Sequence, residues 1–381
     1  MTDRLFLHQI LEQFDLPFVA ISVEPFGEGL INSTFKVSDA GGVPMYVLQR
    51  INHLVFRDVE VLQNNIYRVT EHIRQKLLLG GVTDVDRRVL NLVPTSEGQL
   101  YHFDGESYWR VYRFIRGSKS LSTLTPQSAY LSGQMFGDFQ CMLSDLPEGS
   151  VKESIPGFHN MPLRLSQFNQ ALDENRAGRV REVSDIIDGL KRRGDAYCVQ
   201  EELYAKGELP KRINHCDTKL NNILFDENDT PLCVVDLDTV MPGFVLSDFG
   251  DFVRISGNMG AEDEPDLSRI ALNKNIVLAY AEGYLSKAVS FLNEREVRML
   301  AYGPALMTYM QAVRFFTDYL NGDVYYKIAH EHHNLQRTHA QFRFLQILES
   351  EQQGLREELL SIAALCVGGK VCDVKAGMKL Q

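Results

Sequence analysis

Hydrophobic and polar positions alternate in short runs along the first third of the chain. Between about Val19 and Arg116 these runs are rich in β-branched residues, and turn residues such as Gly41 and Gly42 separate them. Both features are typical of strands in a half-exposed sheet. The pattern predicts a small antiparallel sheet, with strands at VAISVEPF, STFKVSD, YVLQRI, QLYHF and SYWRVYRFI.

One long segment inside this region has helical spacing instead. Between Asp58 and Leu77 the hydrophobic residues recur at steps of three and four, which places them on one face of a helix. They are Val59, Leu62, Ile66, Val69, Ile73 and Leu77. We expect this stripe to lie on the sheet.

After Gly117 the spacing becomes mainly helical. The predicted helices cover residues 128–143, 163–177, 179–194, 198–207, 267–285, 294–320 and 332–353. Two short strand-like runs, 223–225 and 232–238, flank the turn-forming sequence DENDTP and predict one hairpin.

These patterns together predict an α+β fold with two lobes. We expect a small antiparallel sheet in a first lobe at residues 1–116 and a mostly helical second lobe at residues 117–381. A chain of 381 residues, 44% of them hydrophobic, is long enough to bury two cores.

Composition excludes several classes of protein. The chain has 39 Lys and Arg against 50 Asp and Glu, a net charge of −11, and no basic block, so nucleic acid is not an expected partner. No apolar run approaches the ~20 residues that cross a bilayer, and the charged, amphipathic start is unlike a signal peptide. The six cysteines lack the CxxC spacing of a zinc site or a redox pair. We expect a soluble cytoplasmic protein.

The strongest chemical signal is the segment INHCDTKLNNILF, where His215, Asp217 and Asn222 match H-x-D-x-x-x-x-N. In phosphoryl transfer, a carboxylate takes the proton of the acceptor hydroxyl, and an amide oxygen five residues later can bind a metal ion. We therefore predict Asp217 as the catalytic base and substrate contact and Asn222 as a metal ligand. Lys219 could stabilise charge on the transferred group. A lone H-x-D is common in turns, so further signals are needed.

The next strand supplies one of these signals. Asp236 follows the apolar run CVV, fourteen residues after Asn222. A carboxylate at the end of a buried strand needs compensation, and a divalent cation such as Mg²⁺ provides it. We predict Asp236 as a metal ligand, with Asp238 either a second ligand or a turn cap.

A glycine-rich hairpin lies upstream, at PFGEGLINSTFKV. Gly27 and Gly29 would let backbone amides close over phosphates. GxG alone is weak evidence, but the order of elements adds to it. A glycine-rich hairpin, a strand, a helix, another strand, HCDTKLNN and VVDLD follow one another as in a kinase-like fold.

With these motifs in that order, the chain resembles the aminoglycoside phosphotransferase-like small-molecule kinases, and within them the N-acetylhexosamine 1-kinases. The finer resemblance depends on the strings LINSTFKV, YVLQRIN, HCDTKLNN, VVDLDTVMPG, SDFGD and RFFTDYLNGD. It implies ATP, Mg²⁺ and attack by the anomeric hydroxyl of N-acetylglucosamine or N-acetylgalactosamine. Aminoglycoside, choline and homoserine-type kinases are the alternatives. The resemblance also implies that Asp248 supports the catalytic loop.

Three further assignments are less specific. Protein kinases carry a lysine on the third strand, and here either Gln49 or Arg50 could contact phosphate; alternation places the two on opposite faces. Backbone groups near Phe114 and Ile115 could bind the nucleotide base, which leaves ATP and GTP both possible. Arg314 either pairs with Asp318 inside a core helix or binds sugar oxygens, and the resemblance favours the sugar.

Overall fold

The computed structural model describes residues 4–17, 22–27, 31–147 and 149–368. The chain forms two compact units, each built from several stretches of sequence. Unit 1 comprises Met1–Leu121, Met142–Pro156 and Asn221–Pro242, and unit 2 comprises Ser122–Cys141, Gly157–Leu220 and Gly243–Gln381. We predicted a division at residue 116 between a nucleotide-binding lobe and a catalytic and substrate-binding lobe. The compactness of the two units does not test which ligand each part binds, so this division stays a prediction.

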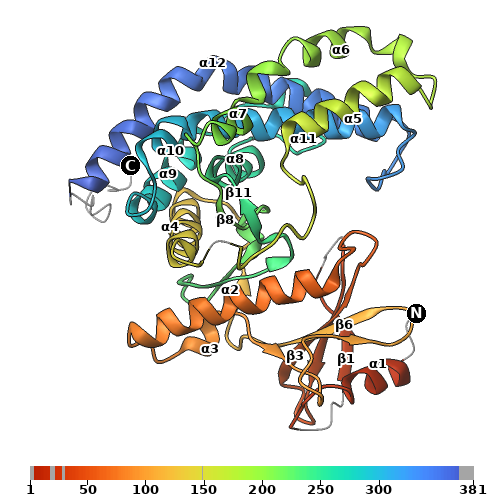
Figure 1. The fold of residues 1–381 in the computed structure, drawn as a ribbon, viewed down its shortest axis with the longest axis vertical. Coiled ribbons are helices and arrows are strands. Elements are labelled where there is room, and N and C mark those ends of the chain that lie inside the picture. The colour runs from red at the N-terminus through yellow and green to blue at the C-terminus, as the bar shows by residue number, and fades with distance from the viewer. Residues whose placement is uncertain (1–3, 18–21, 28–30, 148, 369–381) are drawn as a thin grey trace. The chain divides into compact units, whose positions relative to one another are not determined.

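Unit 1 contains the predicted antiparallel sheet, whose strands follow the order β1-β2-β3-β6-β4, with β5 also paired to β6 (Figure 1). The strands are β1 (Ser22–Pro25), β2 (Ser33–Ser38), β3 (Pro44–Ile51), β4 (Leu92–Val93), β5 (His102–Phe103) and β6 (Tyr108–Arg113). Alternate residues of β2, β3 and β6 form a buried face that includes Val37, Leu48 and Val111. Helix α1 (Arg4–Leu11) packs on this face through Leu7, Ile10 and Leu11.

Two helices and a second small sheet complete unit 1. Helix α2 (Val59–Leu79) starts at the Asp58 cap, as the spacing predicted, and five of the six stripe residues are buried. The other helix is the single turn α3 (Val85–Arg88). The predicted hairpin is confirmed as β9 (Ile223–Phe225) and β10 (Pro231–Val234), and β7 (Lys119–Ser120) pairs with β9.

The run 232–238 was predicted to be strand throughout, and this was wrong at its end. The strand stops at Val234 because Asp236 has a left-handed backbone, with φ 62° and ψ 53°, which cannot continue a strand. A 3₁₀ turn, η4 (Leu237–Thr239), follows.

Unit 2 is helical, with bounds that partly correct the prediction. Its longer helices are α4 (Pro126–Leu143), which begins in unit 2, α5 (Met161–Glu174), α8 (Val245–Ser256), α9 (Lys274–Ala288), α11 (Gly303–Leu320) and α12 (His333–Val367). Shorter pieces are η1 (Val180–Glu182), α6 (Ser184–Lys191), η2 (Asp195–Tyr197), α7 (Val199–Ala205), β8 (Arg212–Asn214), η5 (Leu267–Arg269), α10 (Glu294–Met299) and η6 (Leu300–Tyr302). Two more, η3 (Leu220–Asn222) and β11 (Met241–Gly243), include residues assigned to both units.

The predicted helix 294–320 is interrupted by the 3₁₀ turn η6, and α11 begins after it at Gly303. A Cβ there would lie 2.1 Å from the backbone oxygen of Leu246, so only glycine allows η6 and α11 to pack this closely on α8. The predicted helix 267–285 likewise starts later, at the Asn273 cap, whose side chain accepts the N–H of Ile276.

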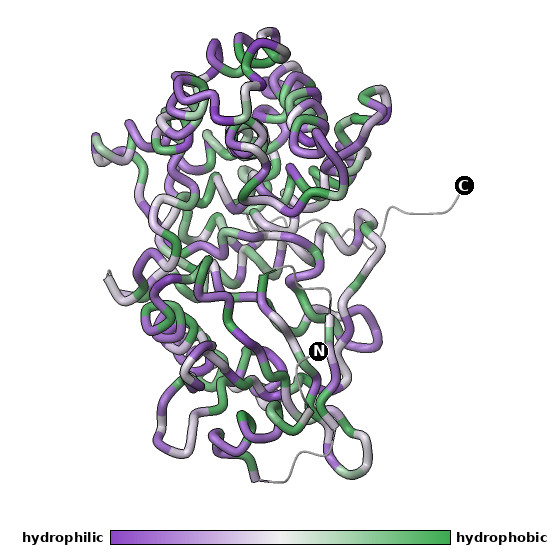
Figure 2. Tube along the Cα trace, turned by 90° about the vertical axis from the view of Figure 1, so that its right-hand side faces the viewer, coloured by the Kyte–Doolittle hydropathy of each residue, from purple (hydrophilic) through white to green (hydrophobic). Residues whose placement is uncertain are grey.

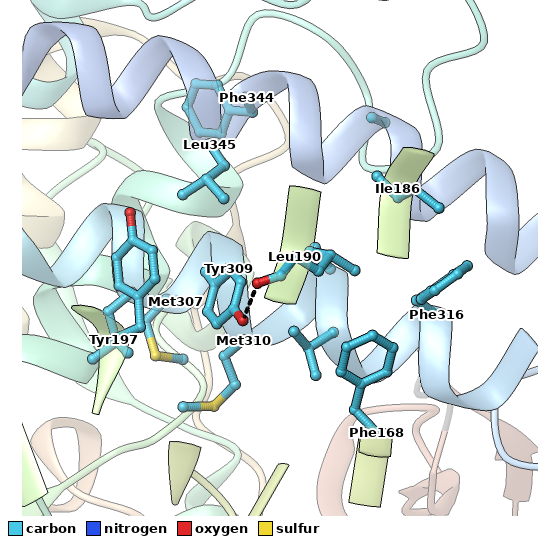
Figure 3. Close-up of a cluster of buried hydrophobic side chains, with 14 of the residues drawn as sticks. Phe168, Ile186, Leu190, Tyr197, Met307, Tyr309, Met310, Phe316, Phe344 and Leu345 are labelled. Atoms are coloured by element: carbon cyan, nitrogen blue, oxygen red, sulfur yellow. Dashed lines mark hydrogen bonds between the residues drawn. The ribbon is translucent and has the colours of Figure 1, made fainter. Parts of the chain in front are cut away.

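Helix α11 forms the centre of unit 2 and contacts α5, α8 and α12. Figure 3 shows part of the surrounding core, where the Tyr309 hydroxyl donates to the Leu190 carbonyl at 2.8 Å. This bond satisfies a polar atom inside an apolar cluster that includes Phe168, Phe316 and Phe344.

Figure 2 shows hydrophilic and hydrophobic positions alternating along the chain. Within the described ranges, no helix is long and apolar enough to span a membrane.

Candidate active site

The H-x-D segment forms a tightly held loop in unit 2. Asp248, in the first turn of α8, accepts the backbone N–H of His215 at 2.7 Å and that of Cys216 at 2.8 Å. Its own carbonyl accepts the Thr218 hydroxyl at 2.6 Å. Cys216 has a φ of 62°, an unfavourable conformation that these bonds compensate. Asp248 therefore supports the loop directly before Asp217, as the resemblance implied.

A buried polar network holds Asp248 itself. Gln140 of α4 donates to Asp248 at 2.8 Å and to Asn214 at 2.9 Å, and the Tyr284 hydroxyl donates to Gln140 at 2.6 Å. Burial raises the pKa of Asp248 to about 6, although the bonds from His215, Cys216 and Gln140 oppose that rise.

Asp217 and Lys219 lie side by side at the end of this loop. The Lys219 Nζ is 2.7 Å from an Asp217 oxygen, and the two side chains are 35% and 31% exposed. Both can therefore meet a ligand, and the pair places a carboxylate next to a cation. This is the arrangement that proton acceptance and charge stabilisation require.

The predicted metal ligands of unit 1 lie around the β9–β10 hairpin. The backbone N–H of Val235 donates to the Asn222 carbonyl at 2.9 Å, so Asn222 is held next to the residue that precedes Asp236. Asp236 is exposed and Asn222 is buried. A carboxylate and an amide oxygen suit Mg²⁺, which binds one or two protein ligands together with phosphate and water. Among the described residues, no group of three or more His, Cys, Asp or Glu could hold a metal ion by itself.

Asp238 has other partners. Arg110 of β6 donates to both of its carboxylate oxygens, at 2.5 and 2.9 Å, and Asn32 donates to one of them at 2.6 Å. Both side chains of the ion pair are almost completely buried. These bonds occupy the carboxylate, which argues against the metal-ligand role that we predicted for Asp238.

The structure places Gln49 and Arg50 on opposite faces of β3. Gln49 accepts a bond from Arg110 at 2.9 Å and donates to Thr34 at 2.9 Å, so it lies on the face with Asp238. Arg50 is exposed and donates to Ser33 at 3.2 Å. Of the two candidates, Gln49 is the one near the predicted metal-binding segment.

The remaining nucleotide-binding candidates are also in unit 1. Gly27 has a φ of 75°, which suits glycine, whereas Gly29 lies outside the described residues. The Phe114 N–H donates to the Met45 carbonyl at 2.9 Å, and the Ile115 carbonyl accepts the Ser118 hydroxyl at 2.6 Å. The Phe114 ring lies 5.9 Å from that of Phe26, next to Gly27. The structure thus brings Gly27 and Phe114 into one neighbourhood of unit 1.

Arg314 and Asp318 do not form the ion pair that we considered. Asp318 instead accepts the backbone N–H groups of Val324, Tyr325 and Tyr326 at 2.8 to 3.0 Å. The Arg314 guanidinium lies 5.3 Å from the Phe158 ring centre and 5.7 Å from that of Tyr326. Its Nη1 donates to the Gln311 side chain at 3.2 Å.

Sequence reasoning missed several residues around Arg314. Arg164 donates to the Phe158 carbonyl at 2.8 Å, and the ring of this phenylalanine lies beside Arg314. Burial and the Arg314 charge lower the pKa of Arg164 to about 10. Burial and the charges of Arg314, Arg164 and Arg254 lower the pKa of His159 to about 3, and Asp217 opposes that effect. Arg164, His159 and Tyr326 stand alone in the sequence, without a motif or spacing that could have indicated them. For Arg110 the sequence offered one signal, which is a charged residue within the strand-like run YWRVY.

The fold and the loop geometry define a phosphotransferase with a protein-kinase-like architecture, and comparison with known proteins gives the family. The phosphotransferase enzyme family (APH) matches residues 22–285, which is more than half of the chain. The chain therefore belongs to this family of small-molecule phosphotransferases.

Solved structures share the fold at low sequence identity. An aminoglycoside phosphotransferase from Alicyclobacillus acidocaldarius subsp. acidocaldarius DSM 446 is 14% identical, with a TM-score of 0.56 over 91% of this chain and 96% of that one. A spectinomycin phosphotransferase in complex with ADP and spectinomycin is 14% identical, with a TM-score of 0.54 over 94% and 100%. A choline/ethanolamine kinase family protein from Mesorhizobium loti is 15% identical, with a TM-score of 0.52 over 94% and 99%. These matches confirm the predicted α+β, kinase-like fold.

Proposed function

We propose that this protein transfers the γ-phosphoryl group of ATP to the anomeric hydroxyl of an N-acetylhexosamine and so produces a sugar 1-phosphate. Family membership supports phosphoryl transfer to a small molecule. The ADP-bound spectinomycin phosphotransferase, which has the same fold, supports an adenine nucleotide as donor. The strings LINSTFKV, VVDLDTVMPG and RFFTDYLNGD support the sugar and its C1 position.

The observation that carries the choice of acceptor is the environment of Arg314. Its guanidinium lies over the rings of Phe158 and Tyr326, so a cation of the protein already occupies these aromatic faces. A second arginine, Arg164, lies within its electrostatic range, and its Nε is buried without a hydrogen-bond partner among the described residues. Choline and aminoglycosides are cations and would be repelled here. A neutral sugar offers hydroxyl and acetamido oxygens, which accept bonds from guanidinium groups.

The proposed chemistry assigns a task to each catalytic side chain. The Asp217 carboxylate accepts the proton of the attacking hydroxyl, and Lys219 stabilises negative charge on the transferred group. Asn222 and Asp236 would hold Mg²⁺, which when bound neutralises charge on the phosphates. Arg314 orients the sugar, and holding both reactants in place supplies much of the rate enhancement.

The nucleotide contacts belong to the proposal as well. Gly27 and Gly29 would cover the phosphates with backbone N–H groups, and backbone near Phe114 and Ile115 would bind the base. Gln49 is the better candidate for the side of β3 that faces the nucleotide, since it bonds to Arg110 and Arg50 lies on the other face.

Phosphorus NMR of product mixtures tests the proposal. The protein is incubated with ATP, Mg²⁺ and one acceptor from a panel of N-acetylglucosamine, N-acetylgalactosamine, glucose, homoserine, choline and an aminoglycoside. We expect a sugar 1-phosphate resonance only with the N-acetylhexosamines and only with metal present. Homoserine is included because its carboxylate would also suit two arginines. Phosphocholine, a phosphorylated aminoglycoside or phosphohomoserine as main product would refute the sugar assignment.

A further inference from the structure

The third strand of this kinase-like sheet has no lysine at the position where protein kinases carry one, and Gln49 stands there instead. The adjacent strand supplies a cation on the same face. Gln49 and Arg110 are direct partners in the antiparallel register of β3 and β6, and the Arg110 Nε donates to the Gln49 side chain at 2.9 Å (Figure 1). Arg110 lies outside the glycine-rich segment, the H-x-D segment and the segment that carries Asp236 and Asp238.

Arg110 does not have the geometry of a nucleotide ligand. Its side chain is 2% exposed, and both of its terminal nitrogens donate to Asp238. With Nε bonded to Gln49, all three guanidinium nitrogens have partners inside unit 1. The planar guanidinium and the carboxylate form a two-point contact that fixes orientation as well as distance.

Asp238 is held from several directions at once. Besides Arg110, it accepts the Asn32 side chain at 2.6 Å, and its backbone carbonyl accepts the Ser154 hydroxyl at 3.0 Å. Asn32 in turn accepts the Asn52 backbone N–H at 2.9 Å. The carboxylate of Asp238 therefore connects strand β6 with Asn32, which directly precedes β2, and its backbone carbonyl connects the same residue with Ser154.

The residue that this network holds in place lies two positions upstream. Asp236 has a left-handed backbone with φ 62°, which is unfavourable for a residue with a side chain. It caps η4, and Asp238 lies inside that same turn. A buried ion pair contributes little net stability, because both charges lose their hydration. We therefore infer that this pair serves mainly to fix one geometry of the turn.

We propose that Arg110 is a positioning residue that, through Asp238, keeps the Asp236 carboxylate oriented toward the divalent cation. This inference rests on the proposed function only in assigning Asp236 and Asn222 to a metal–nucleotide complex, and it does not depend on which acceptor is used.

Binding of Mn²⁺ in the presence of ADP tests the inference without turnover. Electron paramagnetic resonance of free Mn²⁺ gives the metal affinity of the protein–ADP complex, and calorimetry without metal gives the ADP affinity. We expect Arg110→Met to weaken Mn²⁺ binding by about 10- to 100-fold, as for other residues that orient a metal ligand, and to leave metal-free ADP binding nearly unchanged. Arg110→Lys restores part of the loss. Arg113→Met, an exposed arginine on the same strand, serves as the matched control and keeps wild-type affinity.

A paired variant separates positioning from stability. The double variant Arg110→Met/Asp238→Leu removes both buried charges. It should therefore fold even if the single variant Arg110→Met unfolds. We expect this double variant to melt like the wild type and still bind Mn²⁺ weakly. Wild-type Mn²⁺ affinity in either variant would overturn the inference, and an equal loss of metal-free ADP binding would make Arg110 a nucleotide contact instead. Asp236→Asn keeps the two proposals apart. If it weakens Mn²⁺ binding and Arg110→Met does not, the proposed metal site stands and only the role of Arg110 fails, whereas full Mn²⁺ affinity in Asp236→Asn removes the metal site and with it the role of Arg110.

Discussion

Asp217 is the side chain on which the proposed chemistry depends most directly. Its carboxylate is about one-third exposed and bonded to Lys219, at the end of a loop that Asp248 holds by two backbone N–H groups. Because Asp248 holds the loop through these two bonds, we expect the fold to remain intact when the Asp217 charge is removed.

We therefore expect Asp217→Asn to lower kcat by about 10²- to 10⁴-fold, the range for loss of a general base. Its melting temperature and its affinity for ADP should stay at wild-type values, because in the proposed mechanism Asp217 contacts the acceptor and not the nucleotide. Stopped assays with radiolabelled ATP and calorimetry with ADP measure the two effects. Asp185→Asn, an exposed aspartate on α6, is the control. Near-normal turnover in Asp217→Asn would remove this residue as the base.

Arg314 gives a second prediction for a single side chain. If it binds acceptor oxygens, Arg314→Met should raise KM for the acceptor by about tenfold or more, the size of one lost charge-assisted hydrogen bond, with KM for ATP unchanged. Initial-rate kinetics with each substrate varied in turn gives both constants. Arg343→Met, an exposed arginine on α12, should change neither. A rise confined to the KM for ATP would assign Arg314 to the nucleotide.

At the scale of elements, close helix packing depends on small residues. Gly133 of α4 and Gly283 of α9 lie where the two helices cross, and a Cβ on Gly283 would be 1.9 Å from the Tyr130 carbonyl oxygen. A backbone atom cannot move out of the way as a side chain can. The two helices would have to separate, and α4 also carries Gln140, which bonds to Asp248.

We expect Gly283→Ala to lower the free energy of unfolding by at least about 3 kcal/mol. Gly354→Ala is the matched control, since Gly354 lies within helix α12 with no atom within 4 Å of the added Cβ. That change should raise the free energy of unfolding by about 0.5–1 kcal/mol, because alanine favours a helix. Urea unfolding followed by circular dichroism compares the two variants. Equal effects would show that the helices can separate at little cost.

The loop after α11 is another element that one residue organises. Asp318 is buried and accepts three successive backbone N–H groups, and it also accepts the Asn334 side chain at 2.9 Å. Its carboxylate thus fixes the segment that carries Tyr326, whose ring lies next to Arg314.

Asp318→Ala should lower the free energy of unfolding by about 3 kcal/mol, because buried N–H groups lose a charged acceptor. It should also raise the acceptor KM, since Tyr326 is no longer held beside Arg314. Thr317→Ala, at the neighbouring position, should change the free energy of unfolding by no more than about 1 kcal/mol and should leave the acceptor KM unchanged, because the Thr317 hydroxyl bonds within its own helix. Unchanged acceptor KM in a folded Asp318→Ala protein would show that the loop does not affect substrate binding.

For the whole molecule, buried ionisable groups set the pH dependence of stability. The pKa of His159 is lowered to about 3, mainly by burial, so the folded protein keeps this ring neutral. As pH falls below about 6.5, the unfolded chain binds a proton at His159 before the folded protein does, and stability is lost progressively toward pH 3. Asp248 acts in the opposite direction between about pH 4 and 6, because its folded pKa is raised to about 6.

Comparison with His159→Gln isolates the histidine from Asp248 and from the other carboxylates. Between pH 7 and pH 4 the wild type should lose more of its free energy of unfolding than His159→Gln does. Urea unfolding at half-unit pH steps gives the difference between the two curves, which should grow as pH falls. A constant difference would mean that His159 has an ordinary pKa in the folded protein.

Local pattern was sufficient for much of this architecture. The steps of three and four between Val59 and Ile73 predicted α2, and the turn-forming DENDTP predicted the β9–β10 hairpin. The spacing from Asp217 to Asn222, and the order of the motifs, predicted the kinase-like fold. Such features are determined within one helical turn or one loop, so neighbouring residues contain the necessary information.

Tertiary structure decided which partner each polar side chain has. Arg110 and Asp238 are 128 positions apart, and Asn32 and Asp238 are 206 apart, so no local spacing links them. Asp318 lies one helical turn from Arg314, yet it binds the backbone of the following loop. A charged residue in a strand or helix has the same local pattern whether solvent or a distant carboxylate surrounds it. Only the packing of the complete chain brings such partners together. A buried charge needs a partner to offset its lost hydration, and that partner can be far away in the sequence.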